Sequence, residues 1–323
     1  MNPLLLRQLA SIVAQSSPLV FASIGETITE KAGVINLSLD GTILLAAMTS
    51  FVVAFRTGSL ILGFAAAMAV GAALAFLVAF SSISLSQDQV AVGFVLTLLA
   101  DDLSAFLGQP YTRKPGPFVK HTPIPILKDI PILGPIFFNH NIVVYLSLLL
   151  ILVAWLWMYK TQPGLRLQGI GERPEAAFAR GTNVNRLRYL YTIIGGALVG
   201  FAGAAFSLSV KLGWSEGHTR GTGWIALAIV IFGGWHPFRA AFGAYLFGGL
   251  KTVVTYMQRA FPGMPVVLFN TTPWVLMIVT LLLVGSGTVE RLLAMSPPPV
   301  RRVLRGVLRS TPPAALGTTF VKE

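Results

Sequence analysis

Four polar side chains stand inside apolar stretches and are the first candidates for chemistry. Asn36 and Asp40 are four residues apart, so a continuous helix places both on one face, where they line one wall. Asp101 and Asp102 stand together in another apolar stretch. A carboxylate inside a membrane is costly and by default faces protein or water, which favours solute binding or proton transfer. The alternative for Asp40 is a structural role as the cap of its helix.

Two tryptophans bracket a short apolar stretch, residues 221–234. Trp224 stands near its start and Trp235 directly follows its end. Aromatic rings at both ends of a span usually anchor it at the membrane interface. A ring is also a platform for the flat face of a nucleobase or a sugar. The sequence leaves both roles open.

Residue types that support catalysis are absent from the sequence or scattered along it. There is no cysteine and no G-x-x-x-x-G-K-[ST] loop, so thiolate ligands and a phosphate cradle are excluded. His121, His140, His218 and His236 lack the paired spacing of a metal site. No Ser/His/Asp set shares a recognisable local motif. The sequence therefore predicts no enzyme activity, no cofactor and no metal.

The elements that position these side chains are membrane helices. Of the 323 residues, 54% are hydrophobic and only 11% are charged, against roughly 25% charged in soluble domains. Apolar runs of about 20 residues cross the hydrocarbon core as helices, which satisfy every backbone polar group internally. The net charge of +12 resides between these runs and in the tail, as in membrane proteins, so nucleic acid is not expected as a partner. The predicted fold is an all-α polytopic bundle in a lipid membrane.

The apolar runs predict about eight to nine spans. Residues 3–24 form either a short span or an interfacial helix. Residues 221–234 are too short to cross and predict a half-helix or re-entrant segment. The expected spans are 34–55, 59–81, 89–107, 140–159, 187–210, 221–234, 238–257 and 267–287.

Lysine and arginine predict the orientation and two parts of the chain. Residues 160–188 and the tail are rich in both, so each is expected to face the cytoplasm. The proline-rich loop 108–139 then faces outward. Residues 1–290 form the transmembrane domain, and residues 291–323 form a basic cytoplasmic tail. Its "VRRVLRGVLR" stretch predicts a helix lying on the anionic leaflet, with a disordered basic tail as the alternative.

The stretch 160–188 contains one short predicted helix. Pro174 fits a first helical turn, and Gly181 fits the left-handed residue just past the end. The helix between them is about 10 Å long, too short to be stable alone, so it needs a docking surface. The alternative is a solvated loop between two spans. Small and charged side chains around one aromatic anchor suit an interface: Glu172, Arg173, Glu175, Ala176, Ala177, Phe178, Ala179 and Arg180.

This stretch resembles the cytoplasmic coupling loop of ABC importer permeases, whose short helix docks into a groove of the ATP-binding subunit. "GERPEAAFARGTNVNR", Gly171 to Arg186, is similar to the loop "GENPEAARYAGINVNR" of the branch that moves simple sugars and nucleosides. The Ile-x-Leu-Pro continuation of maltose-type permeases is missing. The resemblance implies contact with the ATPase through Glu172, Pro174, Glu175, Ala176, Ala177, Phe178 and Gly181.

Two further stretches resemble the same branch. "GETITEKAGVINLSLDGTILLAAM", Gly25 to Met48, is similar to its N-terminal signature, with Asp40-Gly41 where Glu-Gly is usual. Gly221 to Leu250 resembles its later Gly-x-Gly-Phe block, with Trp224 in the aromatic place. The departures are Thr97, where many relatives have Asn, and the charged Asp101-Asp102 pair. The expected substrate pathway therefore comprises Asn36, Asp40, Thr97, Asp101 and Trp224.

The resemblance implies a permease that switches between two conformations while a separate ATP-binding subunit hydrolyses ATP. A second, distinct permease subunit and an extracytoplasmic substrate-binding protein are the other expected partners, in a bacterial cytoplasmic membrane. The competing hypothesis is a gradient-driven transporter that uses Asp101 and Asp102 as a relay. A nucleoside, a purine and a sugar all remain open as substrates.

Overall fold

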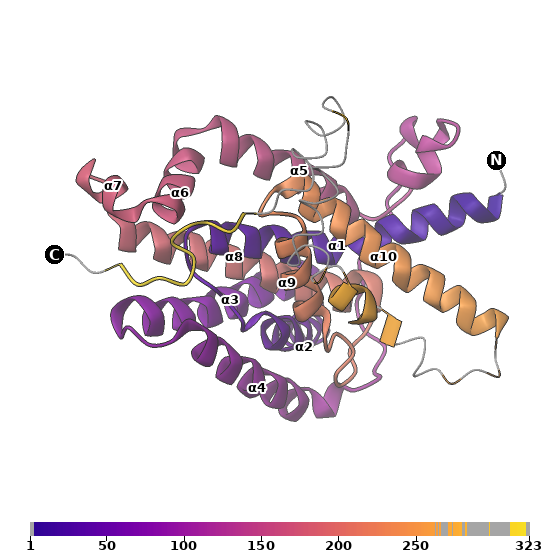
Figure 1. The fold of residues 1–323 in the computed structure, drawn as a ribbon. Coiled ribbons are helices and arrows are strands. Elements are labelled where there is room, and N and C mark those ends of the chain that lie inside the picture. The colour runs from indigo at the N-terminus through magenta and orange to yellow at the C-terminus, as the bar shows by residue number, and fades with distance from the viewer. Residues whose placement is uncertain are drawn as a thin grey trace.

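The computed structural model describes residues 3–261, 263, 265, 271–272, 274–279, 282, 297 and 311–320. Within these ranges the regular secondary structure is helical, and loops and one isolated bridge between His121 and Asn141 make up the rest (Figure 1). The all-α prediction is confirmed. The main helices are α1 Pro3–Lys31, α2 Leu39–Thr57, α3 Leu60–Ala79, α4 Gln89–Gly108, α5 Ile142–Lys160, α6 Gln162–Glu172, α7 Pro174–Ala179, α8 Val184–Ala205, α9 Thr222–Phe232 and α10 Pro237–Ala260. The short turns are Phe80–Ser84, Gln109–Tyr111, Leu127–Asp129, Gly134–Phe138 and Phe206–Val210.

Six helices in the described part of the chain are long and apolar enough to cross a membrane. They are Leu4–Lys31, Leu39–Thr57, Leu60–Ser84, Gln89–Tyr111, Ile142–Lys160 and Val184–Val210. The undecided segment 3–24 is thus part of one long helix, which continues seven residues further, to Lys31. The predicted span 267–287 and the tail helix within 300–309 lie largely outside the described residues. A total of eight or nine spans therefore stays a prediction.

The bundle has two ends. The first, called the α7 end, contains the last turn of α1, the first turn of α4 and the loop around α7. The loop lies close to α1 here, since a Cβ on Gly171 would lie 2.1 Å from the Lys31 carbonyl oxygen. The second, called the opposite end, contains the last turns of α2, α4 and α8. Here the loop after α4 is bonded to the turn after α8, because the Val119 N–H donates to the Leu208 carbonyl over 2.9 Å. Figure 1 places α7 and the N-terminus on opposite sides of the molecule.

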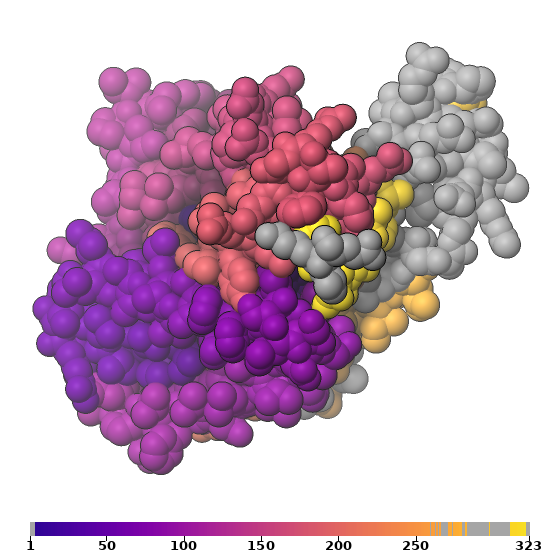
Figure 2. Space-filling model, turned by 90° about the vertical axis from the view of Figure 1, so that its left-hand side faces the viewer, coloured from indigo at the N-terminus to yellow at the C-terminus, as the bar shows by residue number. Residues whose placement is uncertain are grey.

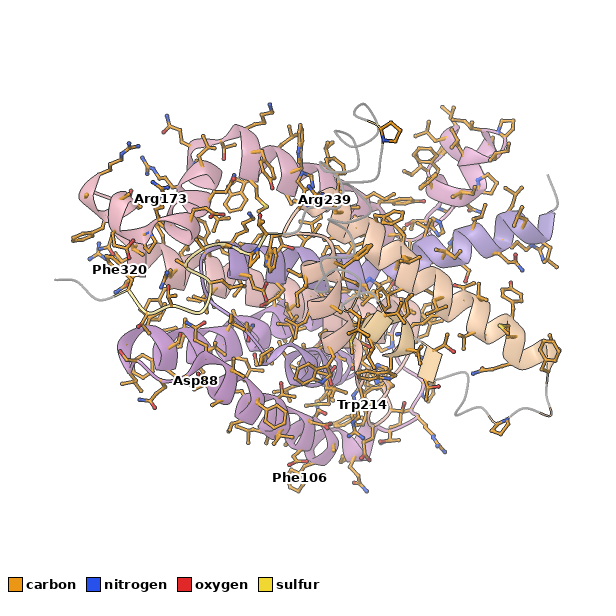
Figure 3. All side chains as sticks on the ribbon, in the orientation of Figure 1. Asp88, Phe106, Arg173, Trp214, Arg239 and Phe320 are labelled. Atoms are coloured by element: carbon orange, nitrogen blue, oxygen red, sulfur yellow. The ribbon has the colours of Figure 1, made fainter. Side chains whose placement is uncertain are left out.

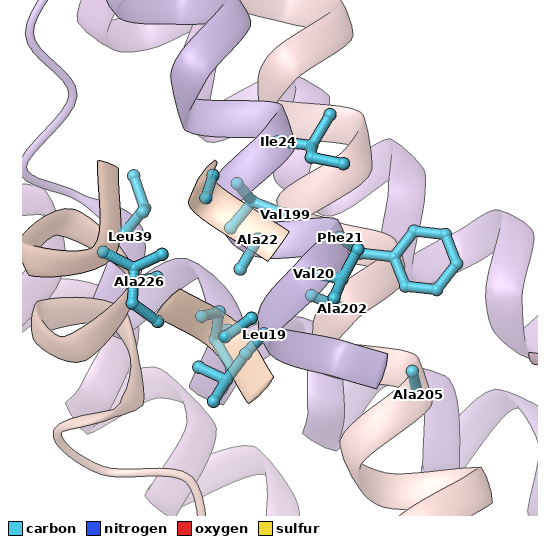
Figure 4. Packing of buried hydrophobic residues seen from close by; sticks show 14 of the residues in the cluster. Leu19, Val20, Phe21, Ala22, Ile24, Leu39, Val199, Ala202, Ala205 and Ala226 are labelled. Carbon is cyan, nitrogen blue, oxygen red and sulfur yellow. The ribbon is translucent and has the colours of Figure 1, made fainter. Parts of the chain in front are cut away.

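Helix α8 lies at the centre and packs against α1, α2 and α3. Its small residues allow close approach, which is how membrane helices gain packing energy in the absence of a hydrophobic drive between them. A Cβ on Gly71 of α3 would lie 2.2 Å from the Gly196 carbonyl oxygen, so only glycine fits there. In the same core Leu19, Ile24 and Val199 are fully buried (Figure 4). The glycine and alanine run near 195–204 is therefore explained by packing.

Helix α9 is the predicted half-helix. Its 11 residues rise about 16 Å, half of a hydrocarbon core about 30 Å thick. It begins after Gly221, whose φ of 84° requires glycine, and contacts α2 there. It ends near Trp235 at the α7 end, where the indole N–H donates to Glu30 of α1. The short segment is confirmed as a helix that runs from inside the bundle to its α7 end.

Candidate functional site

Helix α7 has the local structure that its sequence predicts. Pro174 occupies the first turn, and Gly181 adopts a left-handed φ of 82° just past the end. The Gly181 N–H donates to the Phe178 carbonyl over 2.8 Å, and the Thr182 N–H donates to the Ala177 carbonyl over 3.0 Å. These two bonds satisfy carbonyls that a helix end would otherwise leave unpaired.

The predicted coupling residues share one exposed surface. Six of the seven are exposed or half-buried on α7 and its flanks, and only Pro174 is buried. An exposed phenylalanine on a two-turn helix suits docking to another protein. The seven positions are Glu172, Pro174, Glu175, Ala176, Ala177, Phe178 and Gly181.

Helix α6 precedes α7 and was not predicted, because 160–188 was interpreted as a loop with one helix inside it. Thr161 caps α6 by accepting from the Gly164 N–H over 3.3 Å. A groove of about 520 Å³ lies between α6 and α7, lined by Leu165, Arg166, Arg173, Ala176 and Arg180 among others. Apolar floor and basic rim give this part of the α7 end the features of a protein interface.

A C-terminal segment, residues 311–320, lies across the α7 end and is called the strap below. Figure 2 looks onto this end and shows the strap in yellow beside the pink side chains of α6 to α8. The Ala315 N–H donates to the Gly171 carbonyl over 2.9 Å, and the Gly317 N–H donates to the Gly33 carbonyl over 3.0 Å. The strap therefore joins the end of α1 to the end of α6 through backbone bonds.

Two side chains extend the hold of the strap to α7 and α8. The Phe320 ring packs against Phe178 of α7 with their centroids 5.6 Å apart. Arg188 of α8 is only 1% exposed, and its Nη1 donates to the Thr318 carbonyl over 2.7 Å. Figure 3 shows Phe320 and Arg173 at the same end of the molecule, away from Trp214. A buried guanidinium needs such partners, since an unpaired charge away from water is costly.

Asp40 holds the N-terminus of α9. Its Oδ2 accepts from the Gly221 N–H over 3.0 Å, and its Oδ1 accepts from the Gly223 N–H over 2.8 Å. Both amides belong to the first turn of α9, and the N–H groups of a first turn have no acceptor within their own helix. The helix dipole also favours a negative charge at this end. Contact is close, since a Cβ on Gly223 would lie 2.3 Å from the Asp40 backbone. Asp40 thus fixes the half-helix to α2.

The predicted pairing of Asn36 with Asp40 on one helix face is wrong. Helix α2 begins at Leu39, so Asn36 lies in the connection before it, where its Oδ1 accepts from the Ser38 N–H over 3.1 Å. An amide side chain that bonds backbone two residues ahead favours a turn over a helix. The connection brings Asn36 to α1, since its own N–H donates to Glu26.

The other predicted pathway residues separate into three environments. Thr97 of α4 donates to the Leu37 carbonyl over 2.8 Å and so holds the connection before α2. Asp101 forms an ion pair with Arg220 at 3.0 Å, whereas Asp102 is exposed. Trp224 is half-buried on α9 and packs on the main core. Their role in a substrate pathway stays a prediction.

Comparison with known proteins decides the family. Residues 8–286 match the family described as "Branched-chain amino acid transport system / permease component". The chain belongs to this permease family. A putative glucose ABC transporter permease of Haloferax volcanii is 41% identical over 76% of each chain. A guanosine ABC transporter permease of Bacillus subtilis is 35% identical over 82% of this chain and 88% of its own. No solved structure matches.

A third similar protein is a nucleoside ABC transporter permease of Lactococcus lactis, 31% identical over 85% of this chain and 90% of its own length. All three relatives are permeases, so this is a multi-pass membrane permease and not an enzyme. In its described part no group of three or more His, Asp or Glu is placed to hold a metal.

Sequence reasoning missed two buried acids of this permease, Glu26 and Glu30 in α1. Neither side chain is more than 4% exposed. Glu26 accepts from the Asn36 N–H over 3.2 Å, and Glu30 accepts from Trp235 beyond α9. The two acids stand four residues apart, which places them on one helix face. The available signal was the "GETITEK" motif, but the predicted first segment ended at residue 24.

Proposed function

We propose that this chain is the permease subunit of an ATP-driven importer for nucleosides or simple sugars. The observation that carries the proposal is the α7 end: a capped two-turn helix, exposed on the surface, is held to α1 and α8 by the strap. A permease has no phosphate loop of its own, so the energy enters through a partner. Helix α7 is the point at which that partner pushes.

A push on α7 reaches the interior through contacts that the structure contains. Phe178 contacts the strap, and the strap bonds the end of α1 at Gly33. Glu30 of α1 then holds Trp235 beyond α9. A rigid shift of α1 therefore moves the half-helix, whose other end is fixed by Asp40. This chain of contacts gives the permease a means of exchanging two conformations, for which the solute and the ATP-bound partner subunit have different affinities.

The proposed assembly has four kinds of component. An ATP-binding subunit docks on α7 and on the groove beside it, where Arg166, Arg173 and Arg180 attract acidic side chains. A second, homologous permease subunit completes the pathway. An extracytoplasmic binding protein delivers the solute at the opposite end. The expected location is a bacterial cytoplasmic membrane, with the α7 end in the cytoplasm because it carries the excess of arginine.

The substrate class follows from the relatives, two of which are named for nucleosides or guanosine and one for glucose. Both classes present several hydroxyl groups on a ring. The alternative, a gradient-driven carrier, needs an acid that carries the ion; Asp101 is engaged by Arg220, whereas Asp102 is exposed, so the uptake experiment decides between the two.

Uptake measurements test the proposal. The chain is expressed together with an ATP-binding subunit, a second permease subunit and a binding protein from the same organism, in a host that lacks nucleoside and sugar uptake. Labelled guanosine and glucose are then offered. We expect uptake of at least one solute to stop when ATP is depleted and to survive an uncoupler while ATP remains high. Uptake that collapses with the uncoupler at constant ATP would favour the gradient-driven alternative.

A further inference from the structure

A cavity of about 500 Å³ lies between α1, α9, α10 and the loop after α8, toward the opposite end. The volume is in the range of ligand pockets, about 300–1,000 Å³. Thr222 in the first turn of α9 and Gln15 of α1 are among its lining residues. None of the predicted pathway residues lines the cavity, but Arg220, which does, forms the ion pair with Asp101.

The lining carries an excess of positive charge. Lys211 and Arg220 come from the loop after α8, and Lys251 comes from α10. Arg220 has Asp101 as its partner, but no aspartate or glutamate lines the cavity. The half-buried Lys251 has its ammonium 5.7 Å from the centre of the Phe206 ring. A partly buried ammonium with no carboxylate among the lining residues is costly, which points to a group that arrives with the ligand.

His218 is a hydrogen-bond acceptor among the lining residues. The Nδ1 of His218 lies 2.8 Å from the Ser215 carbonyl oxygen, so Nδ1 carries the proton and Nε2 is an acceptor. Nε2 is buried and has no partner among the described residues. Burial lowers the pKa of His218, opposed by the bond to Ser215, and Lys211 lowers it further, so the ring is neutral at pH 7. The Nε2 of His218 is therefore available to accept a hydrogen bond from a ligand.

An aromatic ring closes one side. Trp274 lines the cavity and lies against Gly221, where a Cβ would come within 2.4 Å of the indole ring. Glycine at this position lets the ring approach the first turn of α9. An indole face beside hydrogen-bonding groups suits a flat or ring-shaped ligand. Trp274 is thus a second candidate for an aromatic platform beside Trp224.

We propose that this cavity binds the transported solute, and that it selects a ring-shaped solute rich in acceptor oxygens. Lys211, Lys251 and Arg220 donate to carbonyl or carboxylate oxygens, and His218 accepts from one hydroxyl or ring N–H. An oxo-purine nucleoside and a sugar acid share this chemistry. Lysine and arginine pair well with the O6 and N7 acceptors of guanine, whereas adenine has a donor in place of O6. The inference rests on the proposed function and specifies its substrate class.

Binding to the full chain in nanodiscs tests the site with four probes: guanosine, adenosine, glucuronate and glucose. We expect guanosine or glucuronate to bind at least tenfold more tightly than its partner probe, adenosine or glucose. Guanosine alone identifies a nucleobase reader, and glucuronate alone identifies a site for acidic sugars. Equal binding within both pairs, or no binding of any probe, would overturn the proposal.

Two variants separate binding from folding. Lys251→Met keeps the side-chain length and removes the charge, so binding of the preferred probe should fall at least tenfold while the thermal midpoint stays level or rises. Lys120→Met is the control, because Lys120 is an exposed lysine outside the cavity. Unchanged binding in Lys251→Met would overturn the assignment. Uptake by the complete importer separates the two proposals. If ATP-dependent uptake is the same in Lys251→Met as in the wild type, the cavity is not the solute site, but the proposed function stands. If the wild type takes up none of the probes in an ATP-dependent manner, the proposed function itself is wrong.

Discussion

The two ends of the bundle differ in what covers them. At the α7 end the strap accepts from the Nη1 of Arg188 and donates to the Gly33 and Gly171 carbonyls, while the Nε and Nη2 of Arg188 have no partner among the described residues. At the opposite end Lys251 and the Nε2 of His218 face a cavity without such partners. A segment of the chain itself covers the α7 end, whereas the opposite end contains a cavity large enough for a small ligand. We therefore propose coupling at the first end and solute recognition at the second.

Asp40 lies between the two ends, and its loss should have the largest effect. In Asp40→Ala the Gly221 and Gly223 amides lose their acceptor, at a cost of about 1–3 kcal/mol for each unsatisfied group. We expect uptake to fall below a tenth of wild type and the thermal midpoint to drop. Asp40→Asn keeps one acceptor oxygen, so its uptake and thermal midpoint should lie between those of the wild type and Asp40→Ala.

The measurement is uptake at equal membrane abundance, with Asp102→Asn as the control because Asp102 is exposed on the same bundle. Normal uptake and an unchanged midpoint in Asp40→Ala would show that α9 keeps its position without this bond, and that the two ends are not joined through it.

Removal of the strap should have the next largest effect. A chain ending at Ser310 leaves Arg188 without the Thr318 carbonyl and α7 without the Phe320 contact. We expect a several-fold loss of uptake with solute binding at the opposite end unchanged. The matched control ends at Phe320 and keeps the strap. Equal uptake by the two truncations would contradict a coupling role for the strap.

The smallest expected effect is a pH dependence of stability that arises from His140. His140, next to α5 at the opposite end, has a lowered pKa because of burial, against its bond to the Ile136 carbonyl. Its unfolded pKa is near 6.5, so the unfolded state binds the proton first and stability is lost as the pH falls below 6.5. The thermal midpoint of the wild type should drop more between pH 7.5 and 5.5 than that of His140→Gln. Equal drops of the thermal midpoint in the two proteins would exclude His140 as a source of the pH dependence.

The sequence predicted those parts whose structure is set by local signals. Pro174 and Gly181 bracket α7, and the shortness of 221–234 identified the half-helix. The Asn36–Asp40 pairing failed because an apolar run from residue 34 conceals the turn that Asn36 forms with Ser38. Apolar periodicity carries no signal for such a side-chain bond.

The strap and the cavity could not be predicted, because both depend on long-range contacts. The Ala315 to Gly171 bond joins residues far apart in the chain through backbone groups that every sequence has. Lys211, in the loop after α8, and Lys251, in α10 packed on α1 and α9, come together only through tertiary packing. Helix α6 was missed for a local reason, since Pro163 and three glycines within it reduce its helical propensity.

Cross-linking of α7 shows whether the ATP-binding subunit docks on this helix. The chain has no cysteine, so a single cysteine introduced at the exposed Ala176 is the only thiol of the permease. In the assembled importer Ala176→Cys should cross-link to the ATP-binding subunit, with a yield that changes between ATP-bound and nucleotide-free states. Lys120→Cys in the loop 108–139 should give no such product. An active importer in which Ala176→Cys never reaches the ATP-binding subunit, or in which Lys120→Cys does, would contradict the account.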